Sequence, residues 1–157
     1  MEVEIRPLQE EDAYTSVRWR NDPEVFRYTG NTYDHVINIE EELCWIRRVI
    51  ANRDEYRCAI LADGKYVGNI YLTGIDGREA VYGIFIGEKS YWGKGVAHQA
   101  TKLLIDYAFS RLGLDRVWLK VKVMNTRAHQ FYLNFGFKEV GHDDVYVTME
   151  IYNTRKC

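Results

Sequence analysis

The sequence predicts a single mixed α/β domain, and three observations support this fold class. The chain has 157 residues, 46% hydrophobic and 28% charged, which is the size and composition of one soluble globular domain. Short apolar runs separated by turn residues predict strands in the middle and at the end of the chain. Longer segments with apolar residues three or four positions apart predict helices before and between these strands.

The first third of the chain is predicted to be one strand followed by helices. Residues 3–8 have a strand pattern, and residues 10–21 place acidic residues in the first turn of an expected helix. Pro23 is typical of the first position of a second short helix. A third helix is expected over residues 37–53, because apolar residues recur there at helical spacing, namely Ile39, Leu43, Ile46 and Ile50.

The middle of the chain is predicted to form three strands and a long helix. The runs "YRCAILA" and "KYVGNIYLT" flank Asp63-Gly64, a dipeptide that predicts a tight β-hairpin. The run "EAVYGIFIG" predicts a strand that is apolar on both faces, so we expect both faces to be covered. The helix that follows should end at Leu112-Gly113 and bury one side, made of Val96, Ala100, Leu103, Leu104, Tyr107 and Ala108.

The last part of the chain is predicted as strand, helix, strand, strand. The run "RVWLKVKV" alternates, with its inward positions at Val117, Leu119, Val121 and Val123. A short helix should begin after a cap at Asn125 or Thr126 and stop at Gly136. "FKEVGH" and "VYVTMEIY" predict the two final strands.

Charge and cysteine content exclude several classes of protein. The net charge of -2 gives no basic field for nucleic acid, and no apolar run approaches the ~20 residues of a membrane span. The N-terminus lacks a signal-peptide pattern. Cys44, Cys58 and Cys157 have no metal-ligand spacing, so we expect inert thiols, no metal and a reduced cytoplasmic location.

The segment "SYWGKGVAHQA" places two glycines around Lys94, where a strand leads into a helix. Glycine weakens a helix, but it allows close approach of a partner to the backbone. A helix start also presents free N–H groups and the positive end of the helix dipole. The segment therefore predicts an anion site, and the alternative is a tight packing turn.

The run "YGIFIGEKSYWGKGVAHQATKLLIDYAF", together with "NTRAHQFYLNFGF", resembles the GNAT acetyltransferase superfamily. The resemblance covers roughly residues 67–137, and the whole chain more loosely. It is strongest to the branch that contains the ribosomal-protein N-terminal and spermidine acetyltransferases. It implies one domain over residues 1–157, with a central mixed, mostly antiparallel sheet flanked by helices.

The resemblance implies acetyl-CoA as co-substrate. The superfamily loop, (Gln or Arg)-x-x-Gly-x-(Gly or Ala), falls on Trp92, Gly95 and Ala97, and Trp92 departs from the general pattern. Backbone N–H groups of this loop should bind the pyrophosphate. The side chains of His98 and Lys94 are candidates to assist the phosphates, and the alternative, which we favour, is that both are ordinary solvated or supporting side chains. The implied cofactor-binding residues are Ile84, Phe85 and Ile86 on the preceding strand, then Trp92, Gly93, Lys94, Gly95, Val96, Ala97, and later Asn125 and Tyr132.

The resemblance also implies catalytic roles. Asn125 should hydrogen-bond the pantetheine arm, and Tyr132 should protonate the departing thiolate. A phenol suits this role because its pKa near ~10 keeps it protonated at neutral pH; the alternative is a core aromatic beside Phe131. Glu79, at the start of the strand, is a candidate base for the amine proton, and the alternative is a solvated turn residue beside Arg78.

Acceptor specificity is expected from the N-terminal third, whose helices and loop should form one wall of the acceptor cleft by analogy with the family. Glu24 would attract a cationic amine, and aromatic residues would stack on a sugar or base, although each alone suits a structural role. The candidate residues are Trp19, Asn21, Glu24, Tyr28 and Tyr33.

These features lead to a functional hypothesis: an acetyl-CoA-dependent N-acetyltransferase acting on a primary amine of a small molecule or peptide N-terminus. One alternative is an amino-sugar nucleotide N-acetyltransferase, because a "WRN" near this position also occurs in such enzymes. Another is a non-catalytic acyl-CoA-binding sensor, against which Tyr132 argues. A P-loop is excluded, because "GKGVA" lacks the lysine-hydroxyl ending. The sequence does not decide whether the chain forms a homodimer.

Overall fold

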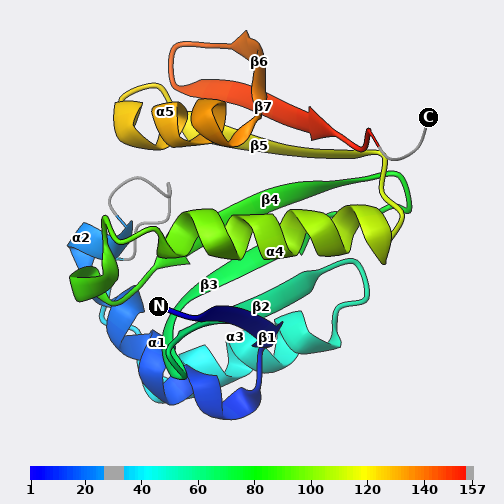
Figure 1. Ribbon diagram of the computed structural model, residues 1–157. Coiled ribbons are helices and arrows are strands. Elements are labelled where there is room, and N and C mark those ends of the chain that lie inside the picture. The colour runs from blue at the N-terminus through cyan, green and yellow to red at the C-terminus, as the bar shows by residue number, and fades with distance from the viewer. Residues whose placement is uncertain (27–33, 155–157) are drawn as a thin grey trace.

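The computed structural model describes residues 1–26 and 34–154. Within these residues, one sheet has the strand order β1-β2-β3-β4-β5-β7-β6 (Figure 1). The strands are β1 Val3–Pro7, β2 Tyr56–Ala62, β3 Lys65–Thr73, β4 Glu79–Ile86, β5 Arg116–Lys122, β6 Lys138–His142 and β7 Tyr146–Tyr152. The helices are η1 Glu10–Asp12, α1 Ala13–Arg20, α2 Pro23–Phe26, α3 Ile39–Ala51, η2 Lys89–Tyr91, α4 Val96–Ser110 and α5 Thr126–Phe135.

The sheet is mixed and mostly antiparallel, as predicted. The only parallel pair in the described sheet is β4 with β5, which are joined through the crossover helix α4. This pair covers three positions, from Glu79 opposite Arg116 to Val81 opposite Trp118. Beyond them the two strands diverge, so β1–β4 and β5–β7 form two lobes that meet at one end (Figure 1).

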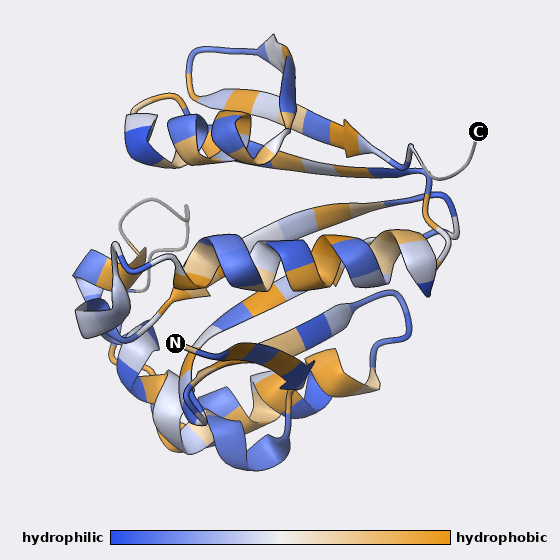
Figure 2. Cartoon of the chain, viewed as in Figure 1, coloured by the Kyte–Doolittle hydropathy of each residue, from blue (hydrophilic) through white to orange (hydrophobic). Residues whose placement is uncertain are grey.

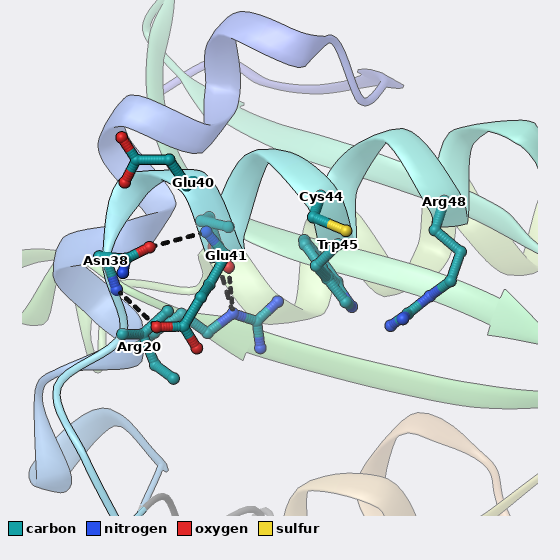
Figure 3. A pocket seen from close by; sticks show the side chains of 9 residues that line it. Arg20, Asn38, Glu40, Glu41, Cys44, Trp45 and Arg48 are labelled. Carbon is teal, nitrogen blue, oxygen red and sulfur yellow. Dashed lines mark hydrogen bonds and ion pairs between the residues drawn. The ribbon is translucent and has the colours of Figure 1, made fainter.

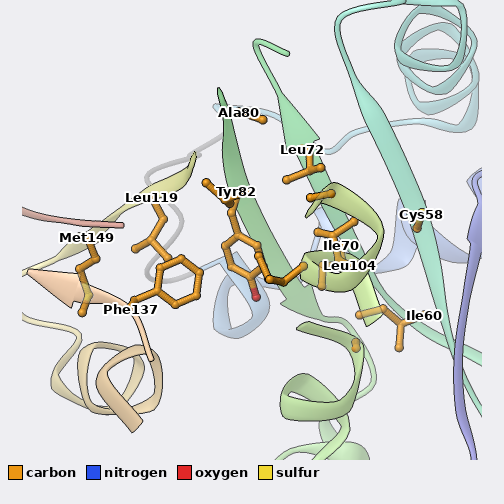
Figure 4. Packing of buried hydrophobic residues seen from close by; sticks show 14 of the residues in the cluster. Cys58, Ile60, Ile70, Leu72, Ala80, Tyr82, Leu104, Leu119, Phe137 and Met149 are labelled. Atoms are coloured by element: carbon orange, nitrogen blue, oxygen red, sulfur yellow. The ribbon is translucent and has the colours of Figure 1, made fainter. Parts of the chain in front are cut away.

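Helices cover both faces of the sheet. On one face, α4 packs on Ile60, Ile70 and Leu72, and the same core continues to Tyr132 of α5 and Phe137 (Figure 4). On the opposite face, Ala59 contacts a smaller core from α1 and α3, made of Ala13, Ile46 and Val49 with Leu8. Neighbouring strand residues such as Ala59 and Ile60 serve opposite faces because side chains alternate along a strand. Figure 2 shows hydrophobic and hydrophilic residues alternating around α3 and α4, which each bury one side.

Local signals fix the boundaries of several elements. The β2–β3 hairpin turns at Asp63 and Gly64, both with positive φ, as the dipeptide predicted. Asn38 caps α3 by accepting the N–H of Glu41 at 2.9 Å, so this helix begins at Ile39 rather than Ile37. Gly136, with φ 127°, ends α5 where predicted.

Three predicted core positions were wrong. Leu103 is 39% exposed and Ile50 is 47% exposed. The direction of each buried face is nevertheless as predicted, because Leu104 on α4 and Ile46 on α3 are fully buried. Val123 is 43% exposed, because it lies one residue beyond the end of β5.

The described residues contain no helix with the length and apolar character that crossing a bilayer requires. Cys44 and Cys58 are free thiols, whereas Cys157 lies outside the described residues. Burial raises the pKa of Cys58 to about 11, which keeps this thiol protonated and unreactive at neutral pH.

Candidate active site

The divergence of β4 from β5 leaves one edge of β4 open. Successive N–H groups of a strand point to opposite edges. The N–H of Gly87 donates to Val67 of β3 at 2.8 Å, so the N–H of Phe85 points to β3 as well. The backbone groups of Ile84 and Ile86 therefore point to the open edge. Of the three residues predicted on this strand, these two direct backbone groups away from β3, whereas the Phe85 side chain packs against Trp19 on the opposite face of the sheet.

The glycine loop has the geometry of an anion site. Gly93 and Gly95 have φ of 75° and 83°, and a Cβ on Gly95 would meet no atom within 4 Å. In the described part of the chain, the backbone N–H groups from Gly93 to His98 donate to no protein acceptor, and helical hydrogen bonding starts with Gln99 to Gly95 at 3.2 Å. These six consecutive backbone donors lead into a 15-residue helix. Such an arrangement suits a pyrophosphate, whose charged oxygens accept hydrogen bonds from backbone N–H groups.

Side chains around this loop hold it and add charge. The Trp92 indole N–H donates to the carbonyl of Ile86 at 2.8 Å, so Trp92 ties the loop to the open edge of β4. The Lys94 ammonium lies 6.0 Å from the centre of the Tyr91 ring. A Cβ on Gly93 would lie 3.5 Å from Nη2 of Arg127, which brings a cation from α5 to the loop. The sequence pattern of the loop contains no signal for Arg127, because this residue is more than 30 positions away.

Asn125 is the N-cap residue of α5. Its Oδ1 accepts the N–H of Ala128 at 3.2 Å, so one end of the amide serves as the helix cap. Its Nδ2 has no hydrogen-bond partner among residues 1–26 and 34–154. This donor suits the predicted hydrogen bond to an amide of the pantetheine arm.

Tyr132 packs in an aromatic group at the inner side of α5. Its ring meets those of Tyr82, Phe137 and Phe131 at centroid distances of 5.7, 5.6 and 5.3 Å. Burial raises the pKa of the Tyr132 phenol above its ordinary value, and the nearby Tyr71 raises it further. The phenol therefore keeps its proton at neutral pH, as a general acid must.

The geometry argues against Glu79 as the base. Glu79 lies where β4 and β5 are still paired, and its carboxylate accepts from Arg116 at 3.1 Å. At about 3.3 Å per strand residue, it is roughly 16 Å along β4 from Ile84. Glu79 was predicted as the base because it lies at the start of β4. However, β4 and β5 separate only after Val81, so Glu79 lies where the two strands are still paired.

The chain is similar to known acetyltransferases in sequence. It is 31% identical to the spermidine N(1)-acetyltransferase of Escherichia coli K12 over 133 residues, which cover 83% of this chain and 69% of that protein. The acetyltransferase (GNAT) domain family matches residues 2–138. The chain belongs to the GNAT acetyltransferase family.

Two further likenesses agree with this GNAT acetyltransferase assignment. An uncharacterized N-acetyltransferase, p20, of Bacillus licheniformis is 30% identical over 128 residues, covering 78% of this chain and 71% of that protein. The fold matches the spermidine N-acetyltransferase of Vibrio cholerae, solved with CoA and spermine, at a TM-score of 0.88 and 24% identity over 97% of this chain and 96% of that one. The protein is thus an acetyl-CoA-dependent N-acetyltransferase that acetylates an amine. The described residues contain no cluster of His, Cys, Asp or Glu that would hold a metal ion.

Trp19 of the acetyltransferase is part of the wall next to β4. It is 3% exposed, and its ring packs against Tyr66 at 4.7 Å and Phe85 at 5.9 Å. Its indole N–H donates to Glu88 at 3.3 Å. A Cβ on Gly87 would lie 2.0 Å from the Trp19 ring, so only glycine admits this contact. The buried Trp19 side chain therefore supports this wall from the core side and does not line its surface.

The other predicted acceptor residues make contacts within the chain. Asn21 accepts the N–H of Ile37 at 2.8 Å and donates to its carbonyl at 2.9 Å, which joins the end of α1 to the chain before α3. Glu24 and Asp22 pair with Lys89 at 3.0 and 2.8 Å, which ties α2 to η2 just before the glycine loop. Sequence spacing gave no signal for Lys89. Tyr28 and Tyr33 lie outside the described residues.

A pocket of about 510 Å³ lies beside α3 on the face opposite α4 (Figure 3). Arg20 forms its floor, because Nε donates to the buried Glu42 at 3.2 Å and the guanidinium lies 4.0 Å from the centre of the Trp45 ring. Ser16 donates to the same carboxylate at 2.5 Å. The remaining pocket residues are Ile37, Asn38, Glu40, Glu41, Cys44 and Arg48.

Proposed function

We propose that acetyl transfer takes place directly between the two substrates in the opening between β4 and β5. One observation supports this proposal above all. The chain combines an unpaired edge of β4, the backbone donors of the glycine loop and the phenol of Tyr132. Acetyl-CoA supplies the activated thioester. The N–H groups from Gly93 to His98 and the Arg127 guanidinium hold the pyrophosphate, while Asn125 and the edge at Ile84 and Ile86 hold the pantetheine arm.

The acceptor amine loses its ammonium proton to water before it attacks, because only the neutral amine has a free lone pair. The nitrogen of a neutral primary amine bonds to the acetyl carbon, and the bond between that carbon and sulfur breaks. Sulfur leaves with the electron pair and takes the proton of Tyr132. The nitrogen, which carries one surplus proton after attack, returns a proton to the Tyr132 phenolate. The products are the N-acetyl amine and free CoA, and Tyr132 is restored.

Glu79 has no part in this proposed mechanism, because its carboxylate is paired with Arg116 at the closed end of the opening. We expect Glu79→Gln to give a pH–rate profile parallel to that of the wild type between pH 6 and pH 9. The free energy of unfolding should fall by about 1 kcal/mol or less, the usual worth of a partly exposed ion pair. A variant that is slow at neutral pH and recovers as the amine deprotonates would reinstate Glu79 as the base.

The acceptor class is supported by the relatives. The Escherichia coli relative is named for spermidine and the Vibrio cholerae structure holds spermine, so we propose a primary amine, with polyamines as the first acceptors to test. Thiol release from acetyl-CoA should be measured with spermidine, spermine, Ser- and Ala-initiated peptides and an amino-sugar nucleotide. At least one amine should raise thiol release well above acetyl-CoA hydrolysis. Acetyl-CoA binding without turnover on any amine would favour the non-catalytic sensor.

The proposal extends to location and assembly. We place the enzyme in the cytoplasm, where acetyl-CoA and reducing conditions for its free thiols coexist. A homodimer is the assembly to test, by measuring the molar mass of the enzyme in solution.

A further inference from the structure

The phenol of Tyr71 reaches from β3 onto β4. Tyr71 pairs with Gly83 of β4, and residues directly opposite on neighbouring strands share one face of the sheet. A Cβ on Gly83 would lie 2.2 Å from Cε2, 2.4 Å from Cζ and 2.6 Å from the hydroxyl oxygen of Tyr71. The end of the phenol therefore occupies the space next to the Gly83 backbone, and glycine leaves the room for it.

Gly83 belongs to the part of β4 that no longer pairs with β5. The last paired residue of β4 is Val81, two positions earlier. Ile84, which follows Gly83, is one of the residues whose backbone groups point to the open edge. The Tyr71 hydroxyl therefore lies beside the segment of β4 at which acetyl transfer is proposed to take place.

The Tyr71 phenol lies on the face of the sheet that carries α1 and α2. Phe85 is two positions after Gly83 and therefore shares its face. The Phe85 ring packs against Trp19 of α1 at 5.9 Å and against Phe26 of α2 at 4.9 Å. Tyr71 packs against the same aromatic cluster. This is the face on which the N-terminal helices are expected to form a wall for the acceptor.

Tyr132 approaches β4 from the other face. Tyr82 precedes Gly83, so its side chain points to the face covered by α4, where Figure 4 shows it in the core with Phe137. The Tyr132 ring meets Tyr82 there at a centroid distance of 5.7 Å. The amine and the departing sulfur are therefore served by different phenols, from different faces of the sheet.

The ring of Tyr71 is held in place by a cation from β2. Arg57 pairs with Tyr71, and its guanidinium lies 4.5 Å from the centre of the ring, within the range of a cation–π attraction. Glu55 accepts two hydrogen bonds from this guanidinium, at 2.7 and 2.9 Å. A polar group fixed in this way needs no reorganisation at the moment of reaction.

We propose that Tyr71 is a catalytic residue for the acceptor: its hydroxyl oxygen accepts a hydrogen bond from one N–H of the neutral primary amine and aims the nitrogen lone pair at the acetyl carbon. This inference rests on the proposed acetyl transfer between β4 and β5. A phenol hydroxyl has one proton and two lone pairs, so the oxygen accepts this bond wherever its own proton is directed.

This contact favours the transition state over the bound substrate. The nitrogen becomes positively charged as it bonds to the acetyl carbon, and a hydrogen bond from a charged donor is stronger than one from a neutral donor. An interaction that strengthens in the transition state raises kcat. The N–H bound to Tyr71 remains in the amide product, whereas the other proton of the nitrogen is the one that restores Tyr132.

The test compares thiol release with a reference amine to hydrolysis of acetyl-CoA without amine. The reference amine is spermidine, or the amine of the panel with the highest wild-type rate if spermidine is not accepted. Tyr71→Phe, which removes only the hydroxyl, should lower kcat with this amine about tenfold, the lower range for a hydrogen bond to a charged group. Hydrolysis and the Kd of CoA should stay within about twofold. Tyr132→Phe should lower both rates, because the thiolate needs its proton with either nucleophile.

Gly83→Ala tests the placement of the phenol independently. Its methyl group would displace the end of the Tyr71 side chain and should lower kcat with the reference amine at least about tenfold, again without loss of hydrolysis. In a Tyr71→Ala background, which removes the ring, the same substitution should change kcat less than about twofold. Tyr56→Phe is the matched control, because Tyr56 is a half-buried tyrosine that stacks on Tyr107 at 4.5 Å, and both rates should stay unchanged.

A binding measurement needs no turnover. In protein labelled with ¹³C at tyrosine Cζ and saturated with CoA, the Tyr71 resonance, identified by its loss in Tyr71→Phe, should shift as the reference amine is added. The Tyr56 resonance, identified in the same way, should not shift.

Other outcomes would overturn the inference. Equal losses of the amine-dependent rate and of hydrolysis in Tyr71→Phe, or no loss in either, would show that Tyr71 acts only in packing, as would a Tyr71 resonance that the amine does not move. If Tyr71→Phe does not fold, Gly83→Ala decides through the same two rates. Failure of the wild type to release thiol with any amine would instead contradict the proposed function, and the inference with it.

Discussion

Replacing Tyr132 with phenylalanine is expected to lower kcat roughly 10²-fold, the lower range for loss of a positioned general acid. The thiolate of CoA then leaves without a proton donor, while the ring contacts with Tyr82 and Phe137 remain. The Kd of acetyl-CoA should change less than about twofold, because only a hydroxyl is removed. Steady-state thiol release and calorimetric titration measure the two quantities separately.

The pH dependence gives a second test of Tyr132. A general acid works while it is protonated and fails as the pH rises through its pKa. Burial raises the pKa of Tyr132, so this failure is moved above the ordinary range of a phenol. The wild type should therefore show no loss of kcat from Tyr132 between pH 7 and pH 10. A wild-type rate in Tyr132→Phe would reduce Tyr132 to a core aromatic.

The second large effect is expected at the glycine loop, where Gly95→Glu should abolish measurable binding of acetyl-CoA. A Cβ at this position meets no atom within 4 Å, so the glutamate side chain has room to extend beside the N–H groups of the loop. Its carboxylate would repel the pyrophosphate and occupy its place. The fold should survive, because a side chain at φ 83° costs roughly 1–2 kcal/mol. Calorimetric titration with CoA provides the measurement.

Matched variants separate charge from backbone strain at this loop. Gly95→Ala has the same strain without the carboxylate and should lose much less affinity. Gly64 has nearly the same φ, 82°, also in open space, so Gly64→Glu reproduces strain and charge in the β2–β3 hairpin and should bind CoA normally. Arg127→Gln should weaken CoA binding about tenfold, as expected for one charged contact. Unchanged affinity in Gly95→Glu would remove the loop from the site.

Much of the fold was predictable because its signals are local. Asp63-Gly64 specifies its turn through the φ values it requires, and Gly136 ends α5 in the same way. The glycine loop was predictable as well, since its two glycines and the helix that follows lie within a few residues. Where only a helical period was available, the direction of the buried face of α4 was right, but the single position Leu103 was wrongly assigned to it.

The remaining part of the site depends on contacts between distant residues, which spacing does not reveal. The Tyr71 phenol lies next to Gly83 only because β3 pairs with β4. Lys89 and Glu24 are 65 positions apart, and their side chains form an ion pair that joins α2 to η2. The sequence pattern had instead predicted that Glu24 attracts the amine substrate. Glu79 was chosen for its place on the strand, whereas the point of divergence from β5 depends on the whole sheet.

The open edge of β4 has a consequence for the colloidal behaviour of the protein. A strand edge with unpaired N–H and C=O groups is a template for another strand, and natural proteins protect such edges against aggregation. Here the edge belongs to the part of β4 beyond Val81, where β4 no longer pairs with β5. CoA that occupies the opening closes this route to association. Saturation with CoA should therefore keep concentrated solutions of the enzyme monodisperse for longer.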